Sequence, residues 1–493
     1  MEALTKHLAA GGSQAPAVEL EPQALQAPDP LQVVTFADDN KGLVKEAKLP
    51  TIGDVVAQPL HRSVTYVPSQ IGAPSDSAIT YTSNPLSLLW YDIKLFICKL
   101  PIAPGVIFPW RFGKDADPYD ELYPSIENLS SVVLHAFLMW SQTIFFLSLP
   151  VCLFLPVFSV GVWMTCMLIF TRIVRYLLNG RKLKVRSSVE VDRDGKFSDE
   201  YWIFLNGVAV GQYWLQSNVD RLALTFGRPV TGIHNTTDGF LFDLLQCLRN
   251  FAYNTADIRE AYACIKEALQ DSRIKKVVFI VHSQGGIEGG LILDWLFAEL
   301  SRSVLEHLEV YTFANAANHF NNPDWSSPTS KDESPESIDK KPPSKNKVIK
   351  HIEHYANVGD FVAQLGVLNY TRVPNRFMGR LFLSPSSGHL FNQHYLHYMF
   401  PLDETRRRVA DENAFMDMDV RLNRYDAGRE DIADATTIAT AGEDDNSIAF
   451  VGDVNKPVAP IVRLKATGKA ERLRVRDFSR LWQYRNGGTP FAL

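Results

Sequence analysis

One stretch decides the fold: Lys276-Val277-Val278-Phe279-Ile280-Val281-His282-Ser283-Gln284-Gly285-Gly286. After the opening lysine, its residues 277–281 are apolar and mostly β-branched, which is typical of a central parallel strand that is buried on both faces. The chain then turns through Ser283 and two glycines and continues into an apolar helix at 291–297. A strand, a serine turn and a helix in this order place the serine hydroxyl at the carboxyl end of the strand.

On both sides of this stretch, short apolar strands alternate with helices. We predict strands at 201–205, 229–234, 308–313, 348–355 and 380–383, and helices at 212–226, 255–269, 289–300 and after residue 390. Such alternation builds a mostly parallel sheet with helices on both faces. The sequence therefore predicts an α/β domain over residues 197–402, with a flexible Ser/Pro/Lys-rich insertion at 324–347.

Composition limits the classes of partner and cofactor. The 493 residues carry a formal net charge of -5, which gives no case for nucleic acid as a partner. The 5 cysteines lack regular spacing, which argues against a disulfide framework and a structural zinc site, so we expect reduced thiols, no metal and no cofactor. Residues 1–30 show no secretory signal, and we predict that residues 1–84 and 403–493 are largely disordered.

Residues 132–170 contain no Asp, Glu, Lys or Arg. A helix that spans a bilayer needs about 20 apolar residues, and this run is roughly twice as long and is interrupted by Pro150 and Pro156. We therefore predict a helical hairpin within 131–178. It is expected either to span the bilayer or to dip into it as a monotopic hairpin, and the alternative is a pair of buried core helices.

Basic residues follow the apolar run, and the positive-inside rule places this end of the hairpin and the α/β domain in the cytosol, at an intracellular membrane. They are Arg172, Arg175, Arg181, Lys182, Lys184 and Arg186. The sequons at Asn128, Asn235 and Asn369 would matter only in a lumenal domain. Residues 85–130, in which apolar groups alternate with basic ones, fit either an interfacial membrane segment or a segment that packs on the α/β domain.

Serine becomes a nucleophile only when a base removes its proton, and an acid and a histidine follow the serine in this arrangement. Asp360 stands in a loop after a predicted strand, where a carboxylate that orients the base belongs. His389, His394 and His397 are the candidate bases, and we favour His389, which precedes a helix, with His394 as the alternative. Simpler roles for Ser283 and Asp360 are helix capping.

The negative charge that develops on a substrate oxygen needs N–H donors. The backbone N–H groups of Gln284 and of Val208, in the turn Asn206-Gly207-Val208, are expected to meet at this edge of the sheet. Alternatively, that turn is only a tight connection.

The segments 281–286, 311–320, 355–360 and 388–389 together resemble serine lipases of the class-3 type, which have the α/β-hydrolase fold. The whole chain resembles a group of poorly characterised fungal membrane-associated proteins. The resemblance implies a catalytic triad of Ser283, Asp360 and His389. Two positions depart from the family pattern, since Val281 and Ala314 stand where it has glycine.

These observations predict a membrane-anchored serine hydrolase that cleaves acyl esters, with the lipid bilayer as a partner and a lipid as the expected substrate. No protein partner is indicated. Val281 and the long polar termini keep a second hypothesis open, an inactive hydrolase-fold scaffold at a membrane. The third hypothesis is acyl transfer, in which an alcohol replaces water.

Overall fold

The structure, a computed structural model, describes residues 63–67, 84–111, 113, 116–239, 241–243, 255–323, 347–371, 376–423, 448–449, 458–460, 462–464 and 470–490. The predicted insertion at 324–347 therefore lies outside the described residues except for Lys347, and so does most of the predicted disorder at 1–84.

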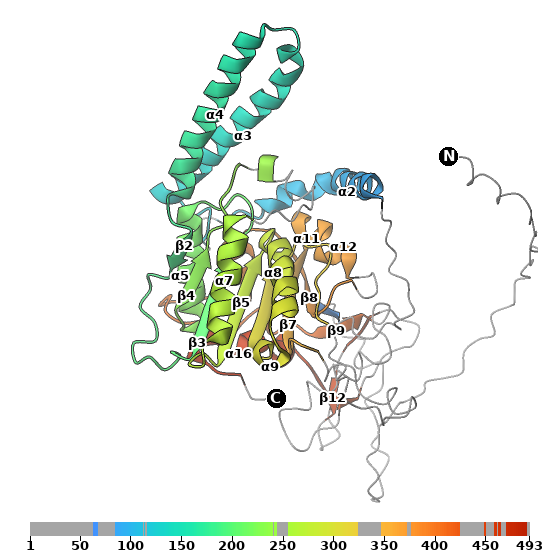
Figure 1. Ribbon diagram of the computed structural model, residues 1–493. Helices are drawn as coiled ribbons and strands as arrows, with labels where there is room; N and C mark the ends of the chain where they lie inside the picture. Colours follow the sequence, from blue (N-terminus) through green and yellow to red (C-terminus); the bar gives the residue numbers. More distant parts are fainter. Residues whose placement is uncertain are drawn as a thin grey trace, which may run out of the picture. The chain divides into compact units, whose positions relative to one another are not determined.

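A large mixed sheet forms the centre of the α/β domain (Figure 1). Among the described residues its 10 strands run in the order β11-β9-β1-β8-β7-β6-β5-β3-β4-β2. From β4 to β8 all neighbours are parallel, whereas β2, β8 and β11 each pair antiparallel with one neighbour. The predicted α/β class with a mostly parallel sheet is confirmed.

The strands of this sheet have the following bounds: β1 Val64–Val67, β2 Lys184–Arg186, β3 Glu200–Leu205, β4 Val230–Ile233, β5 Lys276–His282, β6 Leu308–Phe313, β7 His351–Gly359, β8 Arg380–Ser387, β9 Val420–Asn423 and β11 Val458–Pro460. A second sheet contains β10 (Ile448–Ala449), β12 (Val462–Leu464) and β13 (Ala470–Arg472).

Helices cover both faces of the large sheet. They are α5 (Gln212–Phe226), α7 (Ala256–Gln270), α8 (Gly285–Glu299), α9 (Arg302–Leu305), α11 (Phe361–Leu365), α12 (Val367–Tyr370), the π-helix η4 (Phe391–Leu396), α13 (His397–Met399), α15 (Val475–Phe478), α16 (Arg480–Gln483) and η5 (Arg485–Gly487).

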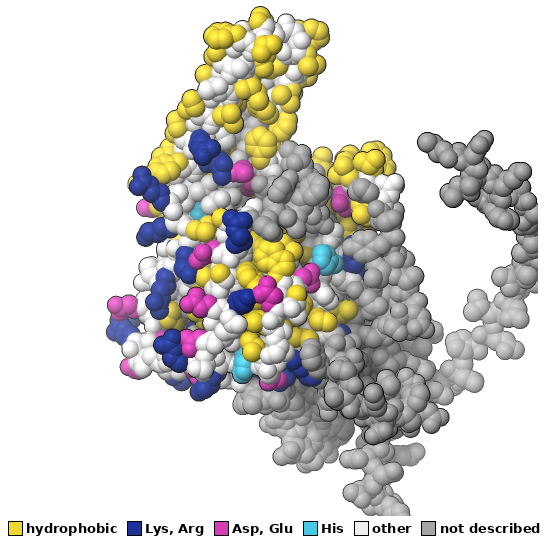
Figure 2. All heavy atoms as spheres, viewed as in Figure 1, with side chains coloured by type: hydrophobic (Ala, Val, Ile, Leu, Met, Phe, Trp, Pro, Cys, Tyr) yellow, Lys and Arg dark blue, Asp and Glu magenta, His cyan; other side chains and the backbone are white. Residues whose placement is uncertain are grey.

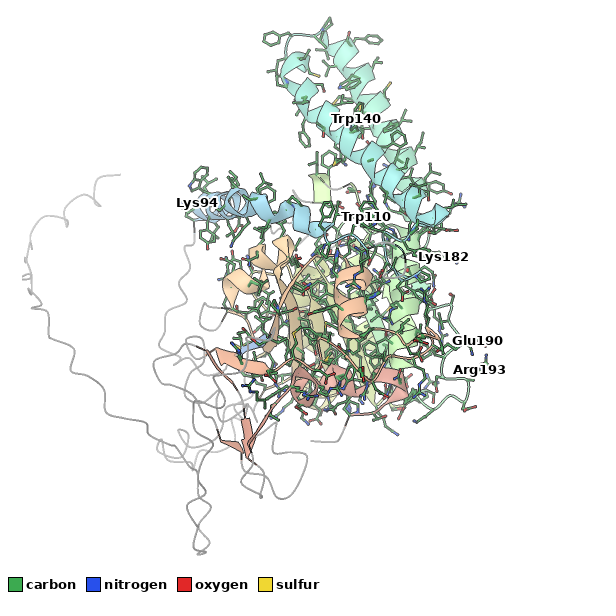
Figure 3. All side chains as sticks on the ribbon, turned by 180° about the vertical axis from the view of Figure 1, so that it is seen from behind. Lys94, Trp110, Trp140, Lys182, Glu190 and Arg193 are labelled. Atoms are coloured by element: carbon green, nitrogen blue, oxygen red, sulfur yellow. The ribbon has the colours of Figure 1, made fainter. Side chains whose placement is uncertain are left out.

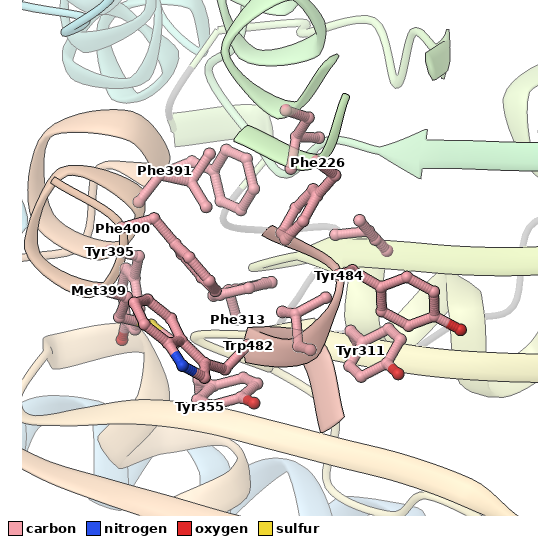
Figure 4. Close-up of a cluster of buried hydrophobic side chains, with 14 of the residues drawn as sticks. Phe226, Tyr311, Phe313, Tyr355, Phe391, Tyr395, Met399, Phe400, Trp482 and Tyr484 are labelled. Carbon is pink, nitrogen blue, oxygen red and sulfur yellow. The ribbon is translucent and has the colours of Figure 1, made fainter. Parts of the chain in front are cut away.

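Strand β5 shows why its sequence is apolar throughout. Val278 and Ile280 belong to a core shared with α5, η4 and the C-terminal helices, which Figure 4 shows in part. Val277, Phe279 and Val281 belong to a second core, shared with α7 and α8. Because successive side chains of a strand point to opposite faces, a strand between two cores has no polar side.

Two ordered parts lie in regions that we expected to be disordered. Strand β1 joins the sheet between β8 and β9, with Val64 and Tyr66 fully buried. Near the other end of the chain, Leu473, Val475, Phe478, Leu481, Trp482 and Tyr484 are buried against the sheet. Short apolar runs of this kind show no periodicity of their own and become ordered only against partners far away in the sequence.

Two long apolar helices, α3 (Ile126–Cys152) and α4 (Val157–Asn179), lie side by side (Figures 1 and 2). Both are long and apolar enough, by length and composition, to cross a membrane. Only 17% of the most apolar window of α3 and 6% of that of α4 is buried. Core helices would be mostly buried, so these low buried fractions disfavour the alternative of a buried core pair.

The guanidinium of Arg228 ties the C-terminal residues to the sheet. Its Nε lies 2.6 Å from the Glu200 carboxylate, and its other nitrogens donate to the carbonyl oxygens of Phe226, Tyr484 and Gly488. The Arg228 side chain is fully buried and lies over the Phe197 ring. One cation thus satisfies an acid and three carbonyl groups in the interior.

We expect Arg228→Met to lower the free energy of unfolding by about 3–5 kcal/mol, because it removes the nearest cation from the buried Glu200 carboxylate and leaves it only the ring N–H of Trp202 at 2.9 Å and Lys276 at 3.6 Å. Denaturant unfolding of the full chain in detergent measures this loss. Arg193→Met is the control, since Arg193 pairs with Glu190 on an exposed loop (Figure 3) and should change little. Equal stability of the two variants would contradict the role given to Arg228.

Candidate active site

Ser283 lies in a sharp turn between β5 and α8. Its φ of +59° falls in the left-handed region, which residues other than glycine seldom adopt. Its N–H donates to the carbonyl oxygen of Phe313 at 3.0 Å, and its own carbonyl accepts from the N–H groups of Gly286 and Ala316. These bonds fix the turn, which holds the hydroxyl at the carboxyl end of the sheet.

The structure brings Ser283, His389 and Asp360 into one chain of hydrogen bonds. The Oγ of Ser283 lies 3.0 Å from Nε2 of His389, and Nδ1 of His389 lies 3.0 Å from both carboxylate oxygens of Asp360. A carboxylate only accepts, so Nδ1 carries the hydrogen and Nε2 is left to accept the serine proton. The three residues follow β5, β8 and β7, whose carboxyl ends meet at one edge of the sheet.

Asp360 is fully buried and has two roles. One carboxylate oxygen accepts from the N–H groups of Val362 and Ala363 and so caps α11, and the other accepts from the hydroxyl of Tyr395 at 2.7 Å. Burial raises the pKa of Tyr395 well above its usual range, so this phenol stays a donor. The capping role and the orienting role, which the sequence left as alternatives, are therefore compatible.

His394, the alternative base, is engaged elsewhere. Its Nδ1 accepts from the N–H of Leu390 at 2.9 Å, and its Nε2 donates to the carbonyl oxygen of Pro109 at 2.9 Å. Burial lowers the pKa of His394 to about 4, so the ring is neutral near pH 7. Its bonds suit a structural role, and His397 lies instead beside Asp120.

His282 is a neighbour of the site that we did not predict. Its Nε2 donates to the carbonyl oxygen of His389 at 2.8 Å, and the two rings lie 4.8 Å apart. Burial lowers the pKa of His282 well below its usual range, so the ring is neutral and adds no charge beside His389. Only its position next to Ser283 could have indicated this contact.

The turn predicted to supply oxyanion donors lies directly against Ser283. A Cβ atom added to Gly207 would fall 2.3 Å from Cβ and 2.8 Å from Oγ of Ser283, so only glycine fits. The turn is held by Asn206, whose amide group exchanges hydrogen bonds with the backbone N–H and carbonyl of Asn235. Gln284 stands at the N-terminus of α8, where helix dipoles favour negative charge.

Buried polar groups that the sequence did not indicate brace this turn. The amide nitrogen of Asn235 donates to Gln284 at 3.0 Å and to Glu288 at 2.7 Å. Burial raises the pKa of Glu288 well above its usual range and that of Asp243 to about 6. Asp243 accepts from the N–H of Ala209, at the far side of the turn. Asn235, the acceptor of one sequon, is itself buried in this network.

The structure accommodates both departures from the lipase pattern. A Cβ atom on Gly289 would approach Cγ1 of Val281 to 3.1 Å, so a glycine in α8 provides the room that Val281 takes up. Ala314 has a φ of +50°, a conformation that glycine adopts more easily. Neither residue disturbs the hydrogen bonds of the triad.

Among the described residues, no group of three or more His, Cys, Asp or Glu side chains could hold a metal ion. A nucleophile, a base with an orienting acid and a turn rich in N–H groups are the parts that acyl transfer needs.

Glycines of α8 provide a matched test of the turn. A Cβ atom on Gly285 would lie 2.7 Å from the carbonyl oxygen of Leu205 and 2.9 Å from that of Asn206, whereas on Gly290 its nearest neighbour would be 3.7 Å away. We expect Gly285→Ala to displace Ser283 and to slow its labelling by a fluorophosphonate about 100-fold. Gly290→Ala should label normally and stabilise α8 by up to about 1 kcal/mol. Equal labelling of both variants would show that this close approach is not needed.

Comparison with known proteins adds little to this geometry. No protein-family model matches the chain, and no curated protein is a significant match. Among solved structures, alpha/beta hydrolase domain-containing protein 10 from mouse is similar at 14% sequence identity, over 42% of this chain and 85% of that chain, with a TM-score of 0.24. A likeness at this TM-score assigns neither a fold nor a function to the chain.

Proposed function

We propose that the chain is a membrane-anchored serine hydrolase that cleaves acyl esters. The observation that carries the proposal is the continuous path of hydrogen bonds from the hydroxyl of Ser283 through His389 to the buried carboxylate of Asp360. It has the geometry in which a histidine can deprotonate a serine while an acid stabilises the resulting imidazolium.

In the first half of the reaction, Nε2 of His389 takes the proton of Ser283 as Oγ attacks the acyl carbonyl. The oxygen of the tetrahedral intermediate accepts from the N–H groups of Gln284 and Val208. His389 then gives its proton to the leaving alcohol, and the acyl group stays on Ser283. In the second half, His389 deprotonates a water molecule that attacks the acyl-enzyme, and the proton returns to Ser283 as the carboxylic acid leaves.

The three side chains of the site are buried, which favours this chemistry. Ser283 is 1% exposed, His389 6% and Asp360 0%. Charges that develop in such a site are screened less than in water, so the fixed donors and the Asp360 carboxylate act more strongly on them.

A second apolar surface supports a membrane as partner and a lipid as substrate. Helix α2 (Pro85–Lys99) and the 3₁₀ helix η1 (Leu100–Val106) pack one face on α11, where Phe96 contacts Phe361. The other face carries exposed apolar side chains, seen in Figure 2 beside the hairpin. They include Leu86, Trp90, Ile97 and Leu100, and the exposed Ile107, Phe108 and Trp110 follow directly after η1. Both expectations for this segment, packing and an interfacial surface, are thus compatible.

Both apolar surfaces belong to the end of the domain that holds the triad. The hairpin is hydrogen-bonded to the loop after β4. The side-chain amide of Gln142 donates to the carbonyl oxygen of Asp238 at 2.6 Å, and the side chain of Asn179 exchanges hydrogen bonds with the backbone of Thr237. Helix α2 contacts α11, which begins directly after Asp360. With α3 and α4 in a bilayer and their basic end in the cytosol, this end of the domain would lie toward the membrane, which supports an ester lipid as the substrate.

We expect a fluorophosphonate to label the purified full chain, and Ser283→Ala to abolish labelling. Asp360→Asn should slow it by about 10⁴-fold, because the imidazole loses the tautomer that accepts the serine proton. Ser303→Ala, at an exposed serine of α9, is the control. An unlabelled wild-type chain would favour the inactive scaffold, and acyl transfer to an added alcohol would favour a transferase over a hydrolase.

We expect Trp90→Glu to slow the hydrolysis of a long-chain ester in phosphatidylcholine vesicles but not that of a water-soluble short-chain ester. Trp90 is 67% exposed on α2, so the charge should disturb contact with lipid and not the packing of the helix. Ser303→Glu places the same charge on an exposed helix of the domain. Equal losses with both substrates would show that α2 does not act at a lipid surface.

A further inference from the structure

The segment that leads into the first apolar helix also contacts the helix that follows His389. We name its described residues, 107–111, 113 and 116–121, the strap; it joins η1 to the turn before α3. Figure 3 shows Trp110 in this segment, between α2 and the base of the hairpin.

The strap meets the first turn of η4 through five hydrogen bonds. The N–H of Asn392 donates to one carboxylate oxygen of Glu121 at 2.8 Å, and the N–H of Gln393 donates to the other at 3.0 Å. The side-chain amide of Asn392 donates to the carbonyl oxygen of Tyr119 at 2.7 Å. The carbonyl oxygen of Pro109 accepts from the side chains of Gln393 and His394, both at 2.9 Å.

Glu121 is suited to hold this helix in place. The first N–H groups of a helix have no partner inside it, and a carboxylate there is favoured by the helix dipole. Glu121 is 3% exposed, and burial raises its pKa to about 7, an effect that the N–H groups of Asn392 and Gln393 partly offset. Its two oxygens therefore fix the position of the backbone immediately after His389.

The helix held by Glu121 touches both partners of Ser283. His389 stands two residues before Phe391, where η4 begins, and Tyr395 within η4 donates to Asp360. A shift of η4 would therefore move the imidazole and remove a donor from the acid. Gly388, between the end of β8 and His389, has a φ of +103°, which fixes the direction in which the chain runs toward the helix.

The strap is also joined to the apolar hairpin. The side-chain amide of Asn128, in the first turn of α3, donates to the carbonyl oxygens of Asp120 and Tyr123, both at 3.0 Å. The residues on either side of Glu121 are thus fixed to the helix that we place in the membrane.

We propose that Glu121 is a positioning residue for His389. Through the strap, the position of the apolar hairpin then affects how the His389 imidazole is aligned with Ser283. The inference rests on the proposed function. Glu121 does not touch the reacting atoms. It acts through η4, by fixing where the imidazole lies relative to Ser283.

The test is the kinetics of Glu121→Gln, measured on the full chain in detergent with p-nitrophenyl butyrate. An amide oxygen accepts from only one of the two N–H groups, and the amide N–H₂ opposes the other. We expect kcat to fall about 10- to 100-fold, with KM unchanged and the thermal midpoint close to that of the wild type. Glu127→Gln removes the same charge from an exposed position in the first turn of α3 and should leave kcat unchanged.

A second variant keeps the inference testable if Glu121→Gln does not fold. Asn392→Ala removes the bond to Tyr119 and should lower kcat by a smaller factor, again without changing KM. A wild-type kcat in both variants, or a loss that only follows the folded fraction, would overturn the inference while Ser283 is still labelled by a fluorophosphonate. A wild-type chain that is not labelled would refute the proposed function itself.

Discussion

The candidate site depends on one constraint, the close approach of three backbone segments at Ser283. The serine adopts a left-handed φ of +59°, the β3–α5 turn touches it through Gly207, and α8 approaches the end of β3 through Gly285. A side chain at either glycine would push these segments apart. A strained residue of this kind persists only where its surroundings determine its conformation, and here backbone hydrogen bonds to Phe313, Gly286 and Ala316 do so.

The two cores on either side of β5 stabilise the strained conformation of Ser283. Residues that alternate along β5 enter opposite cores, so the strand that carries Ser283 is held from both faces. One of these cores is completed by residues close to the C-terminus, among them Phe478 and Trp482, which Arg228 and its carbonyl partners help to hold. Residues far from the active site in sequence thus contribute to the rigidity of the turn.

The sequence could indicate Ser283, Asp360 and His389 because each follows a predicted strand, and parallel strands bring their carboxyl ends to one edge. It could not indicate Glu121 or Asn235, since a lone acid or amide in a loop has no local pattern that reveals a partner. Strand β1 and residues 470–490 also depend on distant partners, which lie 53 to more than 300 residues away in the sequence. Local periodicity predicts elements, whereas long-range polar contacts emerge only from the fold.

These contacts change where the functional unit begins. We expected the α/β domain to start at residue 197, with residues 85–130 either as an interfacial segment or packed on that domain. In the structure, Phe361, directly after Asp360, packs on Phe96 of α2, and Glu121 accepts from the first N–H groups of η4, which follows His389. A chain cut at residue 197 would expose an aromatic side chain beside Asp360 and leave the first N–H groups of η4 without their acceptor. The segment before the hairpin is therefore part of the frame of the site, because its residues contact both the helix that follows Asp360 and the helix that follows His389.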